Sequence, residues 1–122
     1  MKDEMDLITE LKTNSDEILS ISELENRLKE LPDWKIVHED SMNKLMREYT
    51  FDNFSEVLDF TKLIKKLSAQ EDHQPILKST WGKVSIYWWT HTLSGIQERD
   101  FFMASECDRI YLKYKNETTI EE

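Results

Sequence analysis

The residues best suited to proton transfer in this sequence are its three histidines. His73 lies in a polar loop just before Pro75, and His91 lies at the end of the most regular strand pattern in the chain. Histidine titrates near neutral pH, so either side chain can exchange a proton with a substrate. Two ordinary polar histidines in loops would give the same pattern. His38 ends a shorter strand pattern, where a surface position is the simpler interpretation.

The sequence carries no signal for a metal site or for covalent catalysis. His73 and His91 match no spacing of zinc ligands, and the single cysteine, Cys107, makes no CxxC pair. A glycine-rich phosphate loop, a nucleophile elbow and an ordered Ser-His-Asp set are also missing from the sequence. We therefore predict no metal site.

Composition limits the classes of partner. The 122 residues suffice for one domain, and 39% of them are apolar, which is enough for a core. The formal charge is −9, from 25 acidic and 16 basic residues, so phosphate backbones and anionic lipids repel the chain. We therefore predict no direct binding of nucleic acid and no membrane association. The sequence shows no apolar run of membrane-spanning length, no signal-peptide pattern and only one cysteine, so we expect a cytoplasmic location.

The chain divides into one domain and two polar ends. Residues 1–17 are rich in acidic and other polar side chains and are predicted to form a flexible tail. The domain is predicted over residues 18–115, because the firm periodic apolar patterns lie there. Residues 116–122 are polar and are predicted to form a second tail.

The first half of the domain predicts a helix followed by two strands. Ser20 and Glu23 fit a capping box at the start of the helix. Residues 34–37 and 44–51 follow as strands, joined by a polar loop over residues 39–43. Such consecutive strands are expected to pair antiparallel.

A second helix is predicted from a cap at Asp52 or Asn53 to about Ala69. Its apolar side chains cover roughly 220° of the helix surface, about twice what one sheet face needs. The surplus around Phe60 and Leu63 favours a second copy of the chain as a further partner. A helix buried within a single domain is the alternative.

Residues 83–91 form the most regular strand pattern. Apolar side chains lie on one face of this strand, and Trp88 is the last of them. They alternate with a second set on the other face, of which His91 is the last. If the first set faces the helices, His91 faces away from the core, toward an open cleft. A third helix is predicted over about residues 97–114. Together these elements predict an α+β fold in the order α-β-β-α-β-β-α, with a single antiparallel sheet of about four strands and three helices packed on one face.

Several motifs recur at fixed intervals around the two histidines. They are His73-Gln74-Pro75, Trp81, Thr90-His91, Gly95-Ile96 and Asp100. Upstream lie Leu31-Pro32-Asp33-Trp34 and Tyr49-x-Phe51-x-x-Phe54. This set resembles the pattern of the pterin-4a-carbinolamine dehydratases (4a-hydroxytetrahydrobiopterin dehydratases), which runs Leu-x-Gly-Trp, Phe-x-Phe-x-x-Phe, His-His-Pro, an aromatic residue, Thr-His, Gly-Leu-Thr and Asp. The resemblance spans about residues 18–112 and keeps every interval between His73 and Asp100.

The resemblance implies an activity: removal of water from 4a-hydroxytetrahydropterins to give quinonoid dihydropterin, which recycles a pterin cofactor. The pterin is then the substrate, and no cofactor or metal is implied. One group protonates the departing 4a-hydroxyl and another takes the N5 proton, and the family pattern assigns these roles to His73 and His91. Substrate contacts are implied, position by position, for Asp72, Gln74, Pro75, Trp89, Thr90 and Thr92. Asp100 is expected either to orient His91 or simply to occupy the first turn of a helix.

Departures from the family pattern support a second hypothesis. Gln74 replaces the family's second histidine, and Ala69 replaces an acidic residue four positions before His73. A glutamine can hold a pterin edge by hydrogen bonds but cannot shuttle a proton. The alternative is therefore a catalytically drifted member that binds a pterin or serves as an assembly or dimerisation factor for a protein partner, as some members of the family do. Under either hypothesis we expect a homodimer or homotetramer, with His73, Gln74 and His91 converging on one concave site.

Overall fold

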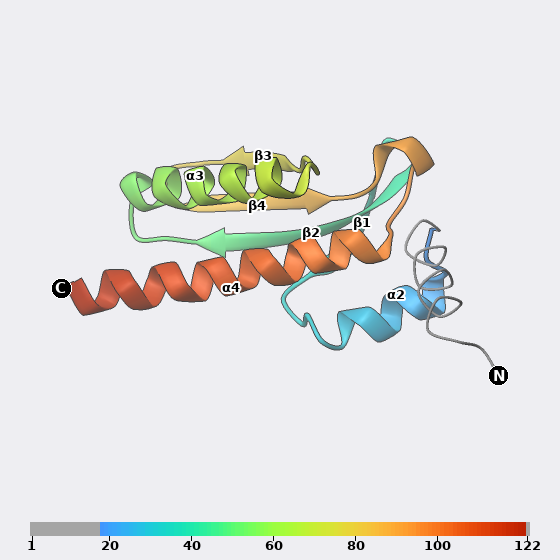
Figure 1. Ribbon diagram of the computed structural model, residues 1–122, viewed down its shortest axis with the longest axis horizontal. Helices are drawn as coiled ribbons and strands as arrows, with labels where there is room; N and C mark the ends of the chain where they lie inside the picture. The colour runs from blue at the N-terminus through green and yellow to red at the C-terminus, as the bar shows by residue number, and fades with distance from the viewer. Residues whose placement is uncertain (1–17, 122) are drawn as a thin grey trace.

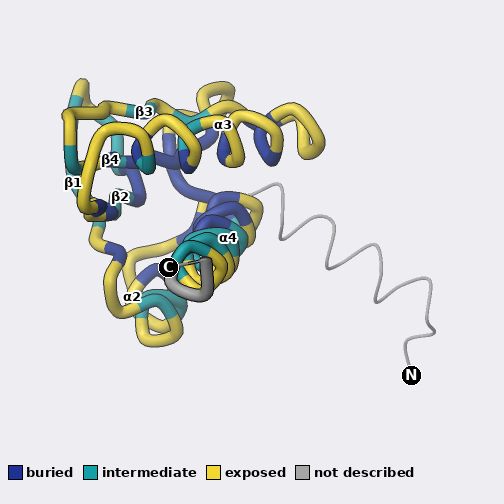
Figure 2. Tube along the Cα trace, turned by 90° about the vertical axis from the view of Figure 1, so that its left-hand side faces the viewer, coloured by how far each residue is buried: buried dark blue, intermediate teal, exposed yellow. Residues whose placement is uncertain are grey.

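Four strands form one antiparallel sheet in the order β1-β2-β4-β3 (Figure 1). The structure, a computed structural model, describes residues 18–121, so the tail predicted for residues 1–17 lies outside the described residues. The strands are β1 (Lys35–Glu39), β2 (Met42–Thr50), β3 (Ile76–Ser79) and β4 (Lys83–Trp88). In the described part of the chain the α-helices are α2 (Ile21–Leu28), α3 (Phe54–Glu71) and α4 (Glu98–Glu121), and they lie on one side of the sheet (Figures 1 and 2). The predicted α+β fold and its element order are confirmed.

The helix α2 begins at its predicted cap. The backbone amide of Glu23 donates to the Ser20 side chain, and the backbone amide of Ser20 donates to the Glu23 side chain, which completes the capping box. The helix ends at Leu28. A tighter turn follows, in which the amide of Leu31 donates to the carbonyl of Leu28. Both leucines pack against the core, whereas Ile21, at the start of the helix, is 73% exposed.

A two-residue turn joins β1 to β2 in place of the predicted longer loop. Asp40 and Ser41 both have positive φ, 53° and 62°. A type I′ hairpin turn requires this conformation at both central residues, and aspartate tolerates it better than most side chains. The turn pairs Glu39 with Met42, so β2 begins before the predicted start at Lys44.

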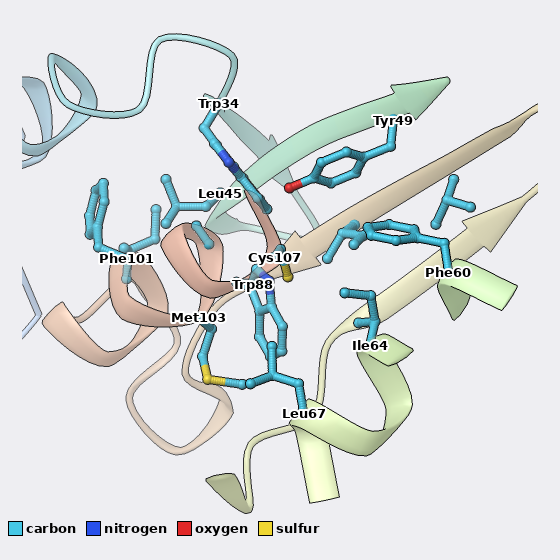
Figure 3. Packing of buried hydrophobic residues seen from close by; sticks show 14 of the residues in the cluster. Trp34, Leu45, Tyr49, Phe60, Ile64, Leu67, Trp88, Phe101, Met103 and Cys107 are labelled. Carbon is cyan, nitrogen blue, oxygen red and sulfur yellow. The ribbon is translucent and has the colours of Figure 1, made fainter. Parts of the chain in front are cut away.

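The core lies between the sheet and the helices α3 and α4 (Figure 3). The helix α3 starts at its predicted cap, Asn53, whose side chain accepts a hydrogen bond from an amide of the first turn. Phe60 is fully buried, with its ring centroid 4.9 Å from that of Tyr49 and 5.1 Å from that of Phe51. The prediction that Phe60 contacts a second copy is therefore wrong, because the aromatic cluster of its own chain covers it. Leu63 keeps 38% of its surface exposed.

A polar cluster centred on Asp108 connects α4 to the sheet and to the segment before β1. The Asp108 Oδ1 atom accepts hydrogen bonds from Trp34 Nε1 at 3.0 Å, Arg47 Nη1 at 2.7 Å and the Tyr49 hydroxyl at 2.5 Å. Burial, with the nearby Asp108 carboxylate, raises the pKa of Tyr49 far above its usual value. Tyr49 therefore remains a neutral donor, and three side chains from two segments, Trp34 before β1 and Arg47 and Tyr49 in β2, share one acceptor atom.

The strand β4 ends at Trp88 rather than at His91. The chain leaves the sheet in a short 3₁₀ helix, His91–Leu93, and Ser94 follows with φ 55°. Thr90 and Gly95 then form an isolated antiparallel bridge that closes this loop. The alternation of side chains between the two faces of the sheet therefore ends before His91.

The helix α4 is longer than predicted. It continues through Glu121, so most of residues 116–122, predicted as a polar tail, are helical. The tail prediction rested on polarity, but a helix that projects past its neighbours can be polar on every side. Over the residues that the structure describes, no helix combines the length and the hydropathy needed to span a bilayer.

Candidate functional site

His73 is buried and held by several contacts. Its Nε2 atom lies 2.5 Å from Oδ1 of Asp100, and its ring stacks on Trp88 with the centroids 5.3 Å apart. The Ser68 hydroxyl donates to the His73 carbonyl at 2.8 Å, which fixes the backbone as well. The helix α3 delivers the residue to this place because Asp72, with φ 49°, ends the helix and turns the chain inward.

Asp100 occupies the first turn of α4 and is fully buried. Its Oδ2 atom accepts hydrogen bonds from the Gln97 amide at 2.8 Å and the Thr90 hydroxyl at 3.0 Å. The bond to Gln97 satisfies a free amide at the helix start, so the helix-terminus role and the orienting role both apply. The orienting prediction needs a correction, because Asp100 binds His73 and not His91. Thr90 is predicted to contact substrate, but its hydroxyl donates a hydrogen bond to this buried carboxylate.

A cleft of about 410 Å³ lies beside His73, between α3 and β3. Its lining residues are Lys65, Ser68, Ala69, Asp72, Gln74, Pro75 and Leu77. Three of the predicted substrate contacts, Asp72, Gln74 and Pro75, are therefore brought together here. Ala69 and Gln74, the two positions that remove a titratable group from the family pattern, line the same cleft. Its volume is within the range of small-molecule sites.

His91 lies apart from this cleft, in the exposed turn that follows β4. Its ring contacts Trp89, with the centroids 4.3 Å apart and the planes tilted by 43°. Thr92, the next residue, is exposed as well. Trp89 is only 3% exposed, so it lies beneath His91 rather than open to solvent.

The two histidines are held by neighbouring tryptophans. Trp88 belongs to the hydrophobic core, whereas Trp89 follows the end of β4, lies outside that core cluster and contacts the ammonium of Lys44. His73 is stacked on Trp88, whereas the ring of His91 contacts Trp89 with the two planes tilted by 43°, so the two imidazoles contact different tryptophans. Neither imidazole lines the cleft that Gln74 lines, so this cleft does not provide the predicted convergence of the three side chains.

The side chains around His73 and His91 can transfer protons and form hydrogen bonds. Among the described residues no three His, Cys, Asp or Glu side chains are grouped so as to hold a metal ion. Burial raises the pKa of the Cys107 thiol to about 12, so it is protonated at neutral pH and is no nucleophile.

One residue near the site was missed in the sequence. Lys44 is 2% exposed although it lies on the sheet face opposite the helices. Its ammonium lies 4.4 Å from the centre of the Trp89 ring and 3.5 Å from Oδ2 of Asp40. Lysine is rarely buried, and only the pairing of β2 with β4 brings this one beside Trp89. No pattern in the sequence signals that contact.

The family of the chain follows from comparison with known proteins. Residues 17–110 match the family model described as pterin 4 alpha carbinolamine dehydratase. The chain belongs to this family. A protein of Chlorobium luteolum, provisionally named a pterin-4-alpha-carbinolamine dehydratase, is 42% identical over 93 residues, which cover 76% of this chain and 82% of the relative. A protein of Saccharophagus degradans with the same provisional name is 38% identical over 91 residues, or 75% of this chain and 80% of the relative.

Solved structures share the fold. A transcriptional coactivator/pterin dehydratase from Brucella melitensis superposes with a TM-score of 0.72 at 26% identity, covering 78% of this chain and 99% of that one. A pterin dehydratase-like protein identified as a RuBisCO assembly factor of the alpha-carboxysome gives a TM-score of 0.56 at 18% identity, covering 65% and 89%. The second likeness, at that identity, concerns the fold alone.

Proposed function

We propose that the protein removes water from 4a-hydroxytetrahydropterins to give quinonoid dihydropterin. The observation that carries the proposal is the cleft lined by Asp72, Gln74 and Pro75, directly beside the buried pair of His73 and Asp100. Membership of the dehydratase family and the names of the relatives support it. The pterin is the substrate in this proposal, and no further cofactor is required.

The proposed roles follow from the surroundings of each side chain. Dehydration needs one group that protonates the departing 4a-hydroxyl and one that accepts the N5 proton, and we assign these to His73 and His91. Asp100 binds Nε2 of His73, which leaves Nδ1 of that ring for proton transfer. His91 is exposed and accessible to a ligand. Gln74 offers both a donor and an acceptor to the edge of the pterin ring.

A second candidate function is binding without turnover, as a pterin-binding protein or as an assembly or dimerisation factor. It is favoured by the cleft itself, because Ala69 and Gln74 leave Asp72 and Lys65 as its only ionisable lining residues among those described. Such a cleft can hold a polar heterocycle but offers little proton transfer near neutral pH.

A coupled dehydration assay on the purified chain separates the two candidates. The enzyme proposal expects turnover in the wild type and at least a tenfold loss in His73→Ala and in His91→Ala, because a placed histidine contributes roughly 10²–10⁴-fold. His38→Ala, which removes the remaining histidine at the exposed end of β1, is the matched control and should match the wild type. Equal background rates in the wild type, His91→Ala and Gln74→His would retire the enzyme proposal and leave the binding role.

We also propose that the chain forms a homodimer or homotetramer and acts in the cytoplasm. The support for association is the outer surface of α3, where Phe54 and Leu58 lie one turn apart and remain 47% and 46% exposed. Together with Leu63 they give this helix apolar surface that its own chain leaves uncovered.

A further inference from the structure

The imidazole of His91 depends on one neighbouring side chain. Within the part of the chain that the structure describes, the ring makes no hydrogen bond, and its ring contact is with Trp89, with the centroids 4.3 Å apart and the planes tilted by 43°. His91 is exposed and begins a short 3₁₀ turn, so backbone packing does not fix its side chain. An exposed side chain without such a contact samples several rotamers.

His73 provides the contrast within the same molecule. Its ring is fixed by the bond to Asp100 and by the stack on Trp88, and its backbone is fixed by Ser68. Loss of any one contact leaves the others in place. The orientation of His91 is therefore more sensitive to a single substitution than that of His73.

Trp89 is itself firmly placed, which makes it a suitable platform. It is 3% exposed, and the ammonium of Lys44 lies 4.4 Å from the centre of its ring, a cation–π contact. Lys44 is anchored in turn by Asp40 and Glu39, with ammonium–carboxylate distances of 3.5 Å and 3.9 Å. A chain of contacts thus runs from the β1–β2 turn through Lys44 and Trp89 to His91.

We propose that Trp89 is a positioning residue that holds the His91 ring for proton transfer, and that Lys44 fixes the indole from the neighbouring strand. Trp89 does not line the cleft beside His73, so its loss should affect the proton-transfer step more than the binding of substrate. The catalytic consequence rests on the proposed dehydratase function, whereas the placement of the His91 ring by Trp89 does not.

Proton NMR of the imidazole signals tests the placement directly, because the chain has only three histidines. In the wild type we expect a nuclear Overhauser contact between the rings of Trp89 and His91, and an upfield displacement of the His91 signals by the indole ring current. Trp89→Leu should move the His91 signals to the positions of a free imidazole. The signals of His73, stacked on Trp88, should stay in place and report an intact fold. Trp89→Phe keeps an aromatic face and should retain part of the displacement.

The kinetic counterpart is measured on the same variants. Trp89→Leu should lower kcat about tenfold at nearly constant KM, since misplacement of a catalytic group by about 1 Å can cost more than that. Trp89→Phe should recover most of the loss.

A wild type without the Trp89–His91 contact, or a Trp89→Leu variant with unmoved His91 signals, overturns the proposal. If Trp89→Leu unfolds, the His73 signals move as well. In that case the Trp89–His91 contact in the wild type and the His91 signals of Trp89→Phe decide whether Trp89 places the ring. Absence of turnover in every variant counts against the dehydratase function alone, because the NMR result still decides the placement.

Discussion

The Nε2 atom of His73 and the Oδ1 atom of Asp100 lie 2.5 Å apart, and both side chains are buried. The pair connects the loop after α3 to the first turn of α4. Hydrogen bonds from Gln97 and Thr90 occupy the other carboxylate oxygen, so the carboxylate is held facing His73.

Replacement of Asp100 by asparagine should lower turnover at least tenfold while KM changes little. The side chain keeps its shape but loses its charge, so it no longer supports a protonated His73 ring during proton transfer. Asp100 does not line the cleft, so substrate binding should be spared. Steady-state kinetics give both constants, with Glu117→Gln, an exposed position on the same helix, as the control. A kcat equal to that of the wild type would assign the pair to packing alone.

The cleft offers a gain-of-function test. Gln74→His places a titratable ring in the cleft, and Ala69→Glu adds a carboxylate to the same lining, so the double variant should turn over faster than either single variant. Both positions are exposed, so the fold should tolerate the changes. Lys62→His, which adds a histidine to α3 outside the cleft, is the matched control. If the double variant stays at the wild-type rate, the cleft is not where the limiting proton moves.

Asp108 should matter for stability more than its surface neighbours. Asp108→Ala leaves the donors of Trp34, Arg47 and Tyr49 without their shared acceptor and should cost about 3 kcal/mol or more of unfolding free energy. Asp108→Asn keeps an acceptor oxygen and should cost less. Urea unfolding measures both variants. Glu106→Ala, which breaks the surface pair with Arg109 on the same helix, should change the free energy by less than about 1 kcal/mol. Equal losses in the alanine variants at 106 and 108 would contradict a special role for this cluster.

Cys107 predicts an alkaline loss of stability. Burial raises the pKa of its thiol from 9.0 to about 12 in the folded chain. Above the unfolded value the unfolded chain loses a proton that the folded chain keeps, so the unfolding free energy falls as pH rises from about 9 toward 12. The slope for this one group is about 1.4 kcal/mol per pH unit. Chemical unfolding of Cys107→Ala over that range should show a shallower decline than the wild type. Parallel curves for the two proteins would show that the thiol does not titrate in this way.

Light scattering at micromolar concentration tests association. The mass should be at least twice 14.7 kDa, because α3 leaves apolar side chains uncovered. Leu58→Glu should shift the mass toward that of one chain, whereas Lys62→Glu, exposed but polar on the same helix, should shift it less. A monomeric wild type would mean that Phe54 and Leu58 are simply exposed apolar side chains.

Much of the fold was predictable because short-range patterns encode it. Arg47 and Tyr49 lie two positions apart in β2, so the alternation of a strand puts both on one face, and both donate to Asp108. The cap at Ser20 and the cap at Asn53 each mark a helix start. The apolar arc on α3 is wider than the surface that the chain buries, because Phe54, Leu58 and Leu63 remain 47%, 46% and 38% exposed. The arc also could not say what covers Phe60, which is covered by aromatic rings of its own chain.

The candidate site was harder to predict because its contacts depend on how distant elements dock. Asp100 is nine positions after His91 in the chain but binds His73, which is 27 positions away, since the first turn of α4 lies against the end of α3. The family pattern named Asp100 without naming its partner. The contact of Lys44 with Trp89 arises only from the pairing of two strands, and a lysine in an alternating strand gives no sign of it.

The shared acceptor atom of Asp108 also has a consequence for how the protein is made. Trp34, Arg47 and Tyr49 lie 74, 61 and 59 positions before it. On the ribosome, where chains grow at about 5–20 residues per second, these three donors are synthesised several seconds before their acceptor. Until α4 emerges, Trp34 and Tyr49 lack the acceptor that they bind in this cluster, and Arg47 has its ion pair with Asp33 at 3.6 Å but not its bond to Asp108. Completion of this domain therefore awaits the synthesis of α4.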